Sequence, residues 1–307
     1  MTTTSVTAED IAAARERIAD VARHTPVLPS ATLTDRVGAS VALKAENLQR
    51  TGSFKVRGAT NKLSALGSAC TAGVVAGSAG NHAQALAHAA RARGVPCEVF
   101  MPVGAPLSKV EGAEALGAKV VIGGDSVVDC LAAATERAEA AGMAVVHPFD
   151  DPDVIAGQGT LGLELLEDVP DLAKIVVPVG GGGLAAGVAI AVKSARPDVE
   201  VIGVQVDTCA AVADALRGHE VRDAPKPLTI ADGIAVKRPG RVTLPLIREW
   251  VDEVVTVSDE EIAEAIVVLM ERAKQVVEGA GAVGVAALIS GRTAPAPEGE
   301  TVAILSG

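Results

Sequence analysis

The stretch GVVAGSAGNHAQALAHAARARG, residues 73–94, places a short apolar run directly before an alanine-rich run. The first part predicts a buried strand and the second predicts a helix. The same order recurs downstream at 97–117 and at 118–142, and a further apolar run follows at 144–149. Strands and helices in strict alternation predict βαβ units on a parallel sheet.

A second set of alternating runs begins at KIVVPV, residues 174–179. A glycine run, a helical pattern, another apolar run and a capped helix at 258–274 follow, and the apolar TVAILSG closes the sequence. We therefore predict an α/β fold with two domains, each built on a mostly parallel sheet flanked by helices. The small domain is expected at 51–150, and the large domain at 1–50 plus 151–307.

Composition excludes several classes of function. The 307 residues carry a net charge of −11 and no long Lys/Arg run, which argues against a nucleic-acid partner. The segment 175–192 is uncharged and long enough for a membrane helix, but Pro178 and four glycines divide it into a strand and a helix, so we expect no membrane span. The start of the sequence lacks a signal-peptide core, and the four cysteines are widely spaced without a CxxC, as is typical of a cytoplasmic protein.

The stretch VPVGGGGLAAG, residues 177–187, sets four glycines between a strand and a helix. Glycines let the backbone turn its N–H groups outward, and the helix start adds partial positive charge, which favours a phosphate site. The spacing of Gly180, Gly182 and Ala185 also fits a dinucleotide fingerprint, with Asp207 near the expected acidic position. Tight packing alone is a third interpretation.

The stretch GSAGNHAQ, residues 77–84, repeats this architecture with Ser78, Asn81 and His82 around Gly80. Backbone and side-chain donors at a helix start suit a carboxylate. The alternative is an ordinary capped helix with a polar first turn.

The stretch TGSFKVRGA, residues 51–59, places Lys55 and Arg57 at a predicted helix start capped by Ser53. The positive end of a helix and a neighbouring arginine should lower the pKa of Lys55 and make it a nucleophile that forms a Schiff base. Arg57 is interpreted either as a tuning charge or as the partner of an acid. A phosphate site, a carboxylate site and an activated lysine together describe pyridoxal phosphate with an amino-acid substrate.

Several motifs resemble, in order, the fold-type II pyridoxal-phosphate enzymes, which share the tryptophan synthase β-like fold: TGSFKVRGATNKL, SAGNHAQALA, DDPDVIAGQGTLGLE, VPVGGGGLAAG, IADGIAVKRPG, VEGAGAVGVAAL and AILSG. The similarity runs from about residue 24 to the end and is strongest to the short catabolic threonine dehydratases (threonine ammonia-lyases). It implies a cofactor in the cleft between the domains, bound as an aldimine to Lys55. It also implies roles for further residues: Phe54 against the ring, Asn81 at the 3′-oxygen, Ser306 at the ring nitrogen, Gly180, Gly181, Gly182, Gly183 and Leu184 at the phosphate, Gly233 and Glu278 along the pocket, and Ser78, Ala79, Gly80, Asn81 and His82 at the substrate carboxylate.

The resemblance implies deamination of L-threonine or L-serine to a 2-oxo acid and ammonia. A hydroxyl such as that of Ser306 cannot keep the ring nitrogen protonated as a carboxylate would, which favours prompt β-elimination. Lys55 is expected to remove the Cα proton before the β-hydroxyl leaves. The family also implies a homodimer or homotetramer and a place in amino-acid metabolism, with isoleucine biosynthesis as one setting.

Rival functions remain on the same scaffold. Serine racemases resemble this chain almost as closely, but they carry a second serine where this sequence has Ala79, and racemisation needs acid–base groups on both faces of the substrate. Gln205 and Ala211 stand where a racemase-like metal site would have acidic ligands, so we expect no metal there. Hydroxyaspartate dehydration, a nicotinamide-dependent oxidoreductase and a non-catalytic amino-acid-binding protein are further alternatives.

One departure from the family concerns the end of the sequence. The family pattern usually continues into further helix, whereas this sequence stops at Gly307 and leaves Ser306 next to last. Chain ends commonly fray, and fraying here would weaken cofactor affinity while leaving the chemistry of Lys55 intact.

Overall fold

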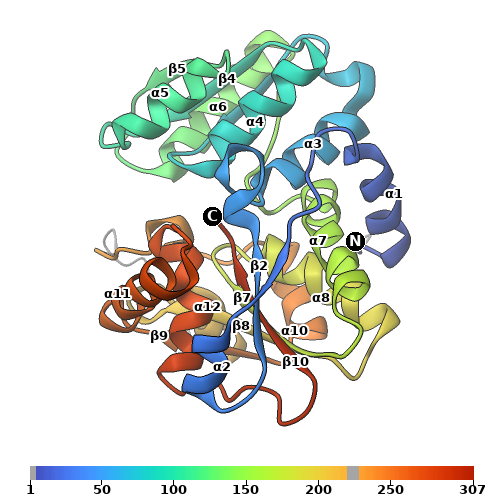
Figure 1. Ribbon diagram of the computed structural model, residues 1–307. Helices are drawn as coiled ribbons and strands as arrows, with labels where there is room; N and C mark the ends of the chain where they lie inside the picture. The colour runs from blue at the N-terminus through green and yellow to red at the C-terminus, as the bar shows by residue number, and fades with distance from the viewer. Residues whose placement is uncertain (1–4, 220–227) are drawn as a thin grey trace.

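The computed structural model describes residues 5–219 and 228–307, which form two sheets with helices on both faces (Figure 1). The six-stranded sheet has the order β1-β2-β10-β7-β8-β9, and only the β1–β2 pair is antiparallel. Its strands are β1 (Val27–Pro29), β2 (Val41–Ala45), β10 (Glu300–Leu305), β7 (Leu172–Pro178), β8 (Glu200–Val206) and β9 (Glu253–Val257). The predicted α/β fold with mostly parallel sheets is confirmed.

The four-stranded sheet is parallel throughout, in the order β5-β4-β3-β6. Its strands are β3 (Val74–Gly77), β4 (Cys97–Met101), β5 (Lys119–Ile122) and β6 (Ala144–Val145). One face packs against α3 (Lys55–Leu66), α4 (Asn81–Arg93) and α5 (Leu107–Ala115), and the other against α6 (Val127–Ala141). We call this the small part and the six-stranded remainder the large part.

Helices also cover both faces of the six-stranded sheet. One core contains α1 (Ala8–Ile18), α7 (Pro152–Asp168), α8 (Gly183–Ala195), α9 (Ala211–Leu216) and α10 (Thr243–Trp250). The opposite core contains α2 (Ala31–Val37), α11 (Asp259–Val268) and α12 (Gly279–Ile289). Short 3₁₀ turns lie at Glu46–Leu48, Arg50–Gly52, Gly67–Cys70, Asp207–Cys209 and Asp232–Ile234.

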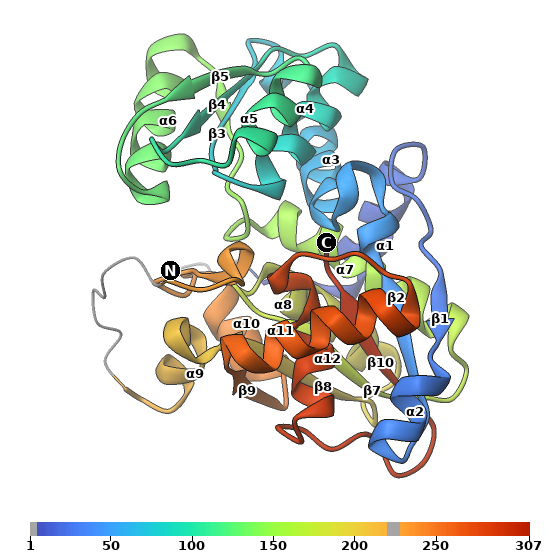
Figure 2. The same cartoon turned by 60° about the vertical axis from the view of Figure 1, so that its left-hand side comes forward.

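Close helix packing joins the small part to the large one. A Cβ added to Gly157 of α7 would lie 2.6 Å from the Cα of Gly58 in α3, so the two backbones are in direct contact and only glycine fits. This contact holds the helix that begins at Lys55 against the large part. The turned view in Figure 2 places the C-terminus at the junction between the two parts, as Figure 1 does.

The structure contains two of the helix caps that the sequence predicts. Thr7 with Asp10 and Ser258 with Glu261 form capping boxes, as predicted. The helix predicted over 258–274 is present, but only its first part is an α-helix: α11 ends at Val268 and the chain continues as a π-helix over Leu269–Ala273. The segment 175–192 divides into β7 and α8 as expected, and none of the helices described reaches the length and apolar character that a membrane span requires.

Candidate active site

The candidate site lies at the junction, where the carboxyl ends of several parallel strands meet. The loop Ser78–Gly80 follows β3, the glycine run follows β7, and Ser306 follows β10. Lys55 begins α3, and the main-chain N–H of Phe54 donates to the carbonyl of Ser306 at 3.2 Å. Parallel strands bring these segments to one edge although they are far apart in sequence.

The amine of Lys55 contacts the segment that follows β6 and the ring of the preceding residue. Its Nζ donates to the carbonyl oxygen of Pro148 at 2.8 Å and lies 5.2 Å from the ring centroid of Phe54. Burial lowers the pKa of Lys55 to about 8. The predicted direction of this shift is therefore confirmed, but its predicted cause, Arg57 at the helix start, is not among the causes found.

The predicted cap of this helix was also wrong. Phe54 occupies the N-cap position of α3 and no side chain caps the helix. The hydroxyl of Ser53 is buried without a hydrogen-bond partner among the described residues. Ser53 instead has an extended backbone that leads from the end of the preceding turn into the site.

Arg57 pairs with acids, as one of its two interpretations predicted. Its guanidinium is buried and forms ion pairs with Glu46 at 2.8 Å and with Glu164 at 2.6 Å. Burial alone would lower the pKa of Arg57, but the two carboxylates outweigh it and raise that pKa above its ordinary value. Arg57 thus stays charged and cross-links α3 to α7 and to the turn after β2.

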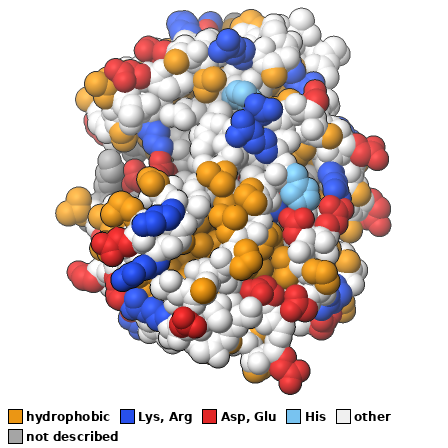
Figure 3. All heavy atoms as spheres, in the orientation of Figure 1, with side chains coloured by type: hydrophobic (Ala, Val, Ile, Leu, Met, Phe, Trp, Pro, Cys, Tyr) orange, Lys and Arg blue, Asp and Glu red, His pale blue; other side chains and the backbone are white. Residues whose placement is uncertain are grey.

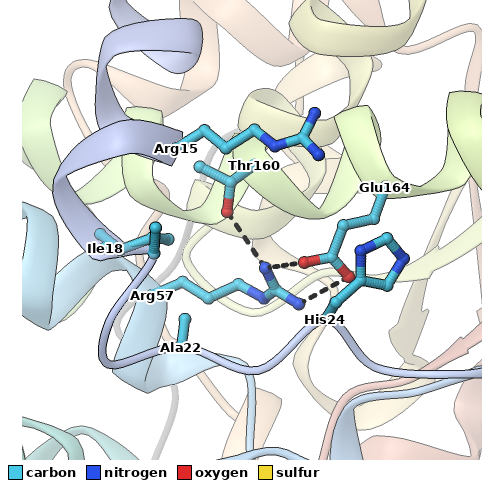
Figure 4. Close-up of a pocket in the computed structure, with 8 residues that line it drawn as sticks. Arg15, Ile18, Ala22, His24, Arg57, Thr160 and Glu164 are labelled. Carbon is cyan, nitrogen blue, oxygen red and sulfur yellow. Dashed lines mark hydrogen bonds and ion pairs between the residues drawn. The ribbon is translucent and has the colours of Figure 1, made fainter.

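A cavity of about 160 Å³ is lined in part by this ion-pair cluster (Figure 4). Arg15, His24, Arg57 and Glu164 contribute its polar lining. Each of these side chains already has a partner, because Arg15 pairs with Glu167, His24 with Asp168, and Arg57 with Glu164. The cavity is separate from Lys55 and offers no unpaired charge to a ligand.

The glycine run forms a cradle of main-chain donors. Gly182 has a φ of 96°, which favours glycine, and α8 begins directly after it. Among the described residues, no hydrogen bond uses the N–H groups of Gly180, Gly181, Gly182, Gly183 or Leu184. Free N–H groups at the positive end of a helix fit an anion such as a phosphate.

The back of the cradle is packed by residues that the sequence analysis missed. A Cβ on Gly181 would lie 2.3 Å from the ring of Phe149, and the hydroxyl of Thr243 donates to the carbonyl of Gly181 at 2.6 Å. The carboxylate of Asp150 accepts from the main-chain N–H groups of Arg241 and Val242, each at 2.8 Å. Phe149 is the last residue of the apolar run at 144–149, which predicts a strand of the parallel sheet. This position at the carboxyl end of a parallel strand was the signal that could have suggested it.

Asn81 and Glu278 meet across the junction. The amide nitrogen of Asn81, the first residue of α4, donates to a carboxylate oxygen of Glu278 at 2.9 Å. Lys109 of α5, which the sequence analysis did not select, donates to the amide oxygen of Asn81 at 2.8 Å and pairs with Glu278. Gly233 lies beside the start of α12, directly after Glu278, since a Cβ on Gly233 would be 3.0 Å from that of Ala280.

Ser306 is held rather than frayed, contrary to the possibility raised by its place near the end of the sequence. It is 6% exposed, and its carbonyl accepts the Phe54 N–H. The main-chain N–H of Glu278 donates to the carbonyl of Gly307 at 3.0 Å. The hydroxyl of Ser306 faces the carbonyl of Ala280 at 3.5 Å, at the outer limit of a hydrogen bond, so it can turn toward another partner.

The loop at 78–82 leads into the start of α4, and its polar side chains already have hydrogen-bond partners within the protein. The hydroxyl of Ser78 accepts from the N–H of Gly80 at 3.3 Å. The buried ring of His82 bonds through Nε2 to the carbonyl of Val146 at 3.0 Å, and burial together with the charge of Lys55 lowers the pKa of His82 to about 3. His82 is therefore neutral, and its imidazole brings no positive charge to a substrate carboxylate.

Gln205, which stands where serine racemases would have an acidic metal ligand, is used inside the fold. Its amide nitrogen donates to the carbonyl of Val179 at 3.2 Å, and its amide oxygen accepts from Val212 and Ala213. Its side chain thus fixes the start of α9 against β7. Within the part of the chain that the structure describes, no three His, Cys, Asp or Glu side chains gather as metal ligands would.

A buried lysine amine and a run of free main-chain N–H groups at the junction of two mostly parallel sheets fit an enzyme that carries pyridoxal phosphate. The chain belongs to the pyridoxal-phosphate dependent enzymes, whose family model matches residues 18–307. It is 50% identical to the L-threonine ammonia-lyase of Thermotoga maritima over 287 residues, which cover 93% of this chain and 71% of that protein. It is 44% identical to the catabolic L-threonine dehydratase TdcB of Escherichia coli strain K12 over 304 residues, covering 98% and 92%.

Solved structures of enzymes named for other reactions share this fold. Maize serine racemase superimposes with a TM-score of 0.94 at 35% identity, over 98% of this chain and 93% of that one. The family match supersedes the nicotinamide-dependent alternative for the glycine run. The choice between elimination and racemisation must come from residues at the site.

Proposed function

We propose that this chain is a threonine ammonia-lyase, which converts L-threonine to 2-oxobutanoate and L-serine to pyruvate with release of ammonia. The observation that carries the proposal is the amine of Lys55, with its pKa lowered to about 8, at the junction that also holds the glycine cradle. The names of the relatives at 50% and 44% identity support the substrate.

The residues present fit pyridoxal phosphate. The unpaired N–H groups of Gly180 to Leu184 would hold its phosphate, Phe54 would lie against its ring, and Ser306 would face the ring nitrogen. When bound, the cofactor supplies an electron sink that stabilises negative charge at the substrate Cα. Ser306 offers a hydroxyl and no carboxylate, so it would leave the ring nitrogen uncharged and make the electron sink weaker than a carboxylate would.

Lys55 would act twice, first by holding the cofactor through Nζ and then by taking the proton from the substrate Cα. A pKa near neutrality suits a general base, because the amine is uncharged in a useful fraction of molecules. The main-chain N–H groups at the start of α4, beside Ser78 and Gly80, would bind the substrate carboxylate. The imidazole of His82 would support this loop through the carbonyl of Val146.

Ala79 separates elimination from racemisation. Ala79 lies in the loop 78–82, which we propose to bind the substrate carboxylate, and its methyl group can neither donate nor accept a proton. Racemisation requires a proton donor on the face opposite Lys55, and Ala79 provides none.

The proposal is tested by the products formed from a panel of hydroxy amino acids. We expect 2-oxobutanoate from L-threonine and pyruvate from L-serine, with D-serine formed from L-serine far more slowly than pyruvate. An Ala79→Ser variant, which restores a hydroxyl to the loop, should gain racemisation of L-serine. Release of no 2-oxo acid, or D-serine formed faster than pyruvate, would refute the assignment.

We also propose that the chain works in the cytoplasm as a homodimer or homotetramer. The four cysteines are free and buried, which suits a reducing compartment. Figure 3 shows apolar side chains gathered near the centre of one face, in front of the six-stranded sheet, where a second copy could cover them. Light scattering measures the number of copies in this assembly directly.

The metabolic role is a separate proposal. The Escherichia coli relative is named a catabolic enzyme, which favours threonine breakdown over isoleucine biosynthesis for this chain.

A further inference from the structure

Three side chains from three elements form one cluster across the junction. Asn81 begins α4 and Lys109 lies in α5, both in the small part, while Glu278 precedes α12 in the large part. The Asn81 amide nitrogen donates to Glu278 at 2.9 Å, and its amide oxygen accepts from Lys109 at 2.8 Å. Lys109 and Glu278 also form a direct ion pair, which closes the triangle.

The chemistry of the two charged partners leaves Asn81 a single orientation. A lysine ammonium can only donate hydrogen bonds, and an ionised carboxylate can only accept them. The amide oxygen must therefore face Lys109 and the amide nitrogen must face Glu278. One hydrogen of the amide nitrogen is used by Glu278, which leaves the second N–H to donate to a third group.

We propose that Lys109 is a positioning residue that, together with Glu278, turns the amide N–H of Asn81 toward the 3′-oxygen of the bound cofactor. This inference rests on the proposed function and on the family resemblance, which implies that Asn81 meets that oxygen. A fixed N–H donor stabilises the oxygen in its anionic form through a charge-assisted hydrogen bond. An amide turned by half a rotation would set its own oxygen against that anion.

Lys109 has a second effect on the same oxygen. A lone carboxylate at Glu278 would repel an anionic oxygen bound beside Asn81. The ion pair with Lys109 compensates this charge at close range. The carboxylate is itself anchored, because the main-chain N–H of Glu278 donates to the carbonyl of Gly307 at 3.0 Å. The side chains of Lys109 and Glu278 are 20% and 36% exposed, so the pair is only partly screened by water.

The test compares the holoenzyme with a Lys109→Met variant, which keeps the length of the side chain and removes the charge. Two quantities are measured: the dissociation constant of pyridoxal phosphate and the ratio of its visible to its near-ultraviolet absorption band. We expect the dissociation constant to rise about tenfold, the size of one hydrogen bond to a charged group. The visible band, which reports the anionic 3′-oxygen, should fall relative to the near-ultraviolet band.

Two further variants separate positioning from a general loss of charge. Lys109→Arg keeps a donor-only cation and should restore the spectrum. Lys119→Met removes an exposed lysine that pairs with Glu98 in the same part of the molecule, and it should change neither quantity. A Lys109→Met protein with the spectrum and affinity of the parent would overturn the inference, as would a Lys109→Arg protein as impaired as Lys109→Met. A changed spectrum in an enzyme that releases no 2-oxo acid would uphold the inference and refute only the proposed reaction.

Discussion

At the scale of single residues, the chemistry of the site depends on the environment of Lys55. The sequence placed a lysine at a helix start, and a lowered pKa followed from elementary electrostatics. The structure confirms the direction of the pKa shift of Lys55 but gives it a different cause. Burial accounts for the lowered pKa, and the charge of Arg57 is neutralised by Glu46 and Glu164. No local pattern could reveal Glu164 as a partner, because it lies more than a hundred residues from Arg57.

The lowered pKa of Lys55 predicts how fast the cofactor-free protein takes up pyridoxal phosphate at different pH values. Only the neutral amine attacks an aldehyde, and its fraction rises as pH climbs through the pKa of the folded protein, about 8. At pH 7 about one amine in ten is neutral, against about one in 3,000 for an ordinary lysine. The uptake rate should level off above pH 8 to 9, as stopped-flow absorbance can measure. A rate that keeps rising to pH 10 would show an unperturbed amine.

At the scale of elements, the alternation of strands and helices was predictable because apolar runs and glycine turns mark each boundary. The glycine cradle after β7 and the start of α4 were found in this way. The π-helix after α11 was not, because its residues continue the helical pattern without a break. The packing behind the cradle was also missed, since Thr243 reaches Gly181 from a distant helix.

The hydrogen bond between Thr243 and Gly181 allows a test of the glycine cradle. Its hydroxyl is buried and donates to the carbonyl of Gly181, so Thr243→Val leaves that carbonyl unpaired. An unpaired buried acceptor costs about 1–3 kcal/mol. We expect a lower free energy of unfolding for the cofactor-free protein and weaker binding of pyridoxal phosphate, measured by denaturation and by cofactor titration. Thr243→Ser keeps the hydroxyl and serves as the matched control; equal behaviour of the two variants would contradict this role.

At the scale of the whole molecule, the site exists only because two sheets meet. Lys55 and Asn81 come with the small part, while the glycine cradle, Glu278 and Ser306 come with the large part. Motif spacing could indicate which residues belong to a site, but not which of them touch. Pro148, Phe149 and Lys109 were therefore missed, as their roles depend on how the two parts are placed against each other.

The central claim is that this junction holds pyridoxal phosphate on the amine of Lys55. Reduction of the purified holoenzyme with borohydride, followed by peptide mass spectrometry, tests it most directly. We expect a pyridoxyl-phosphate adduct on the peptide that contains Lys55, and no adduct in a Lys55→Ala variant. An adduct on a different lysine, or no adduct on a protein that retains its cofactor, would contradict it.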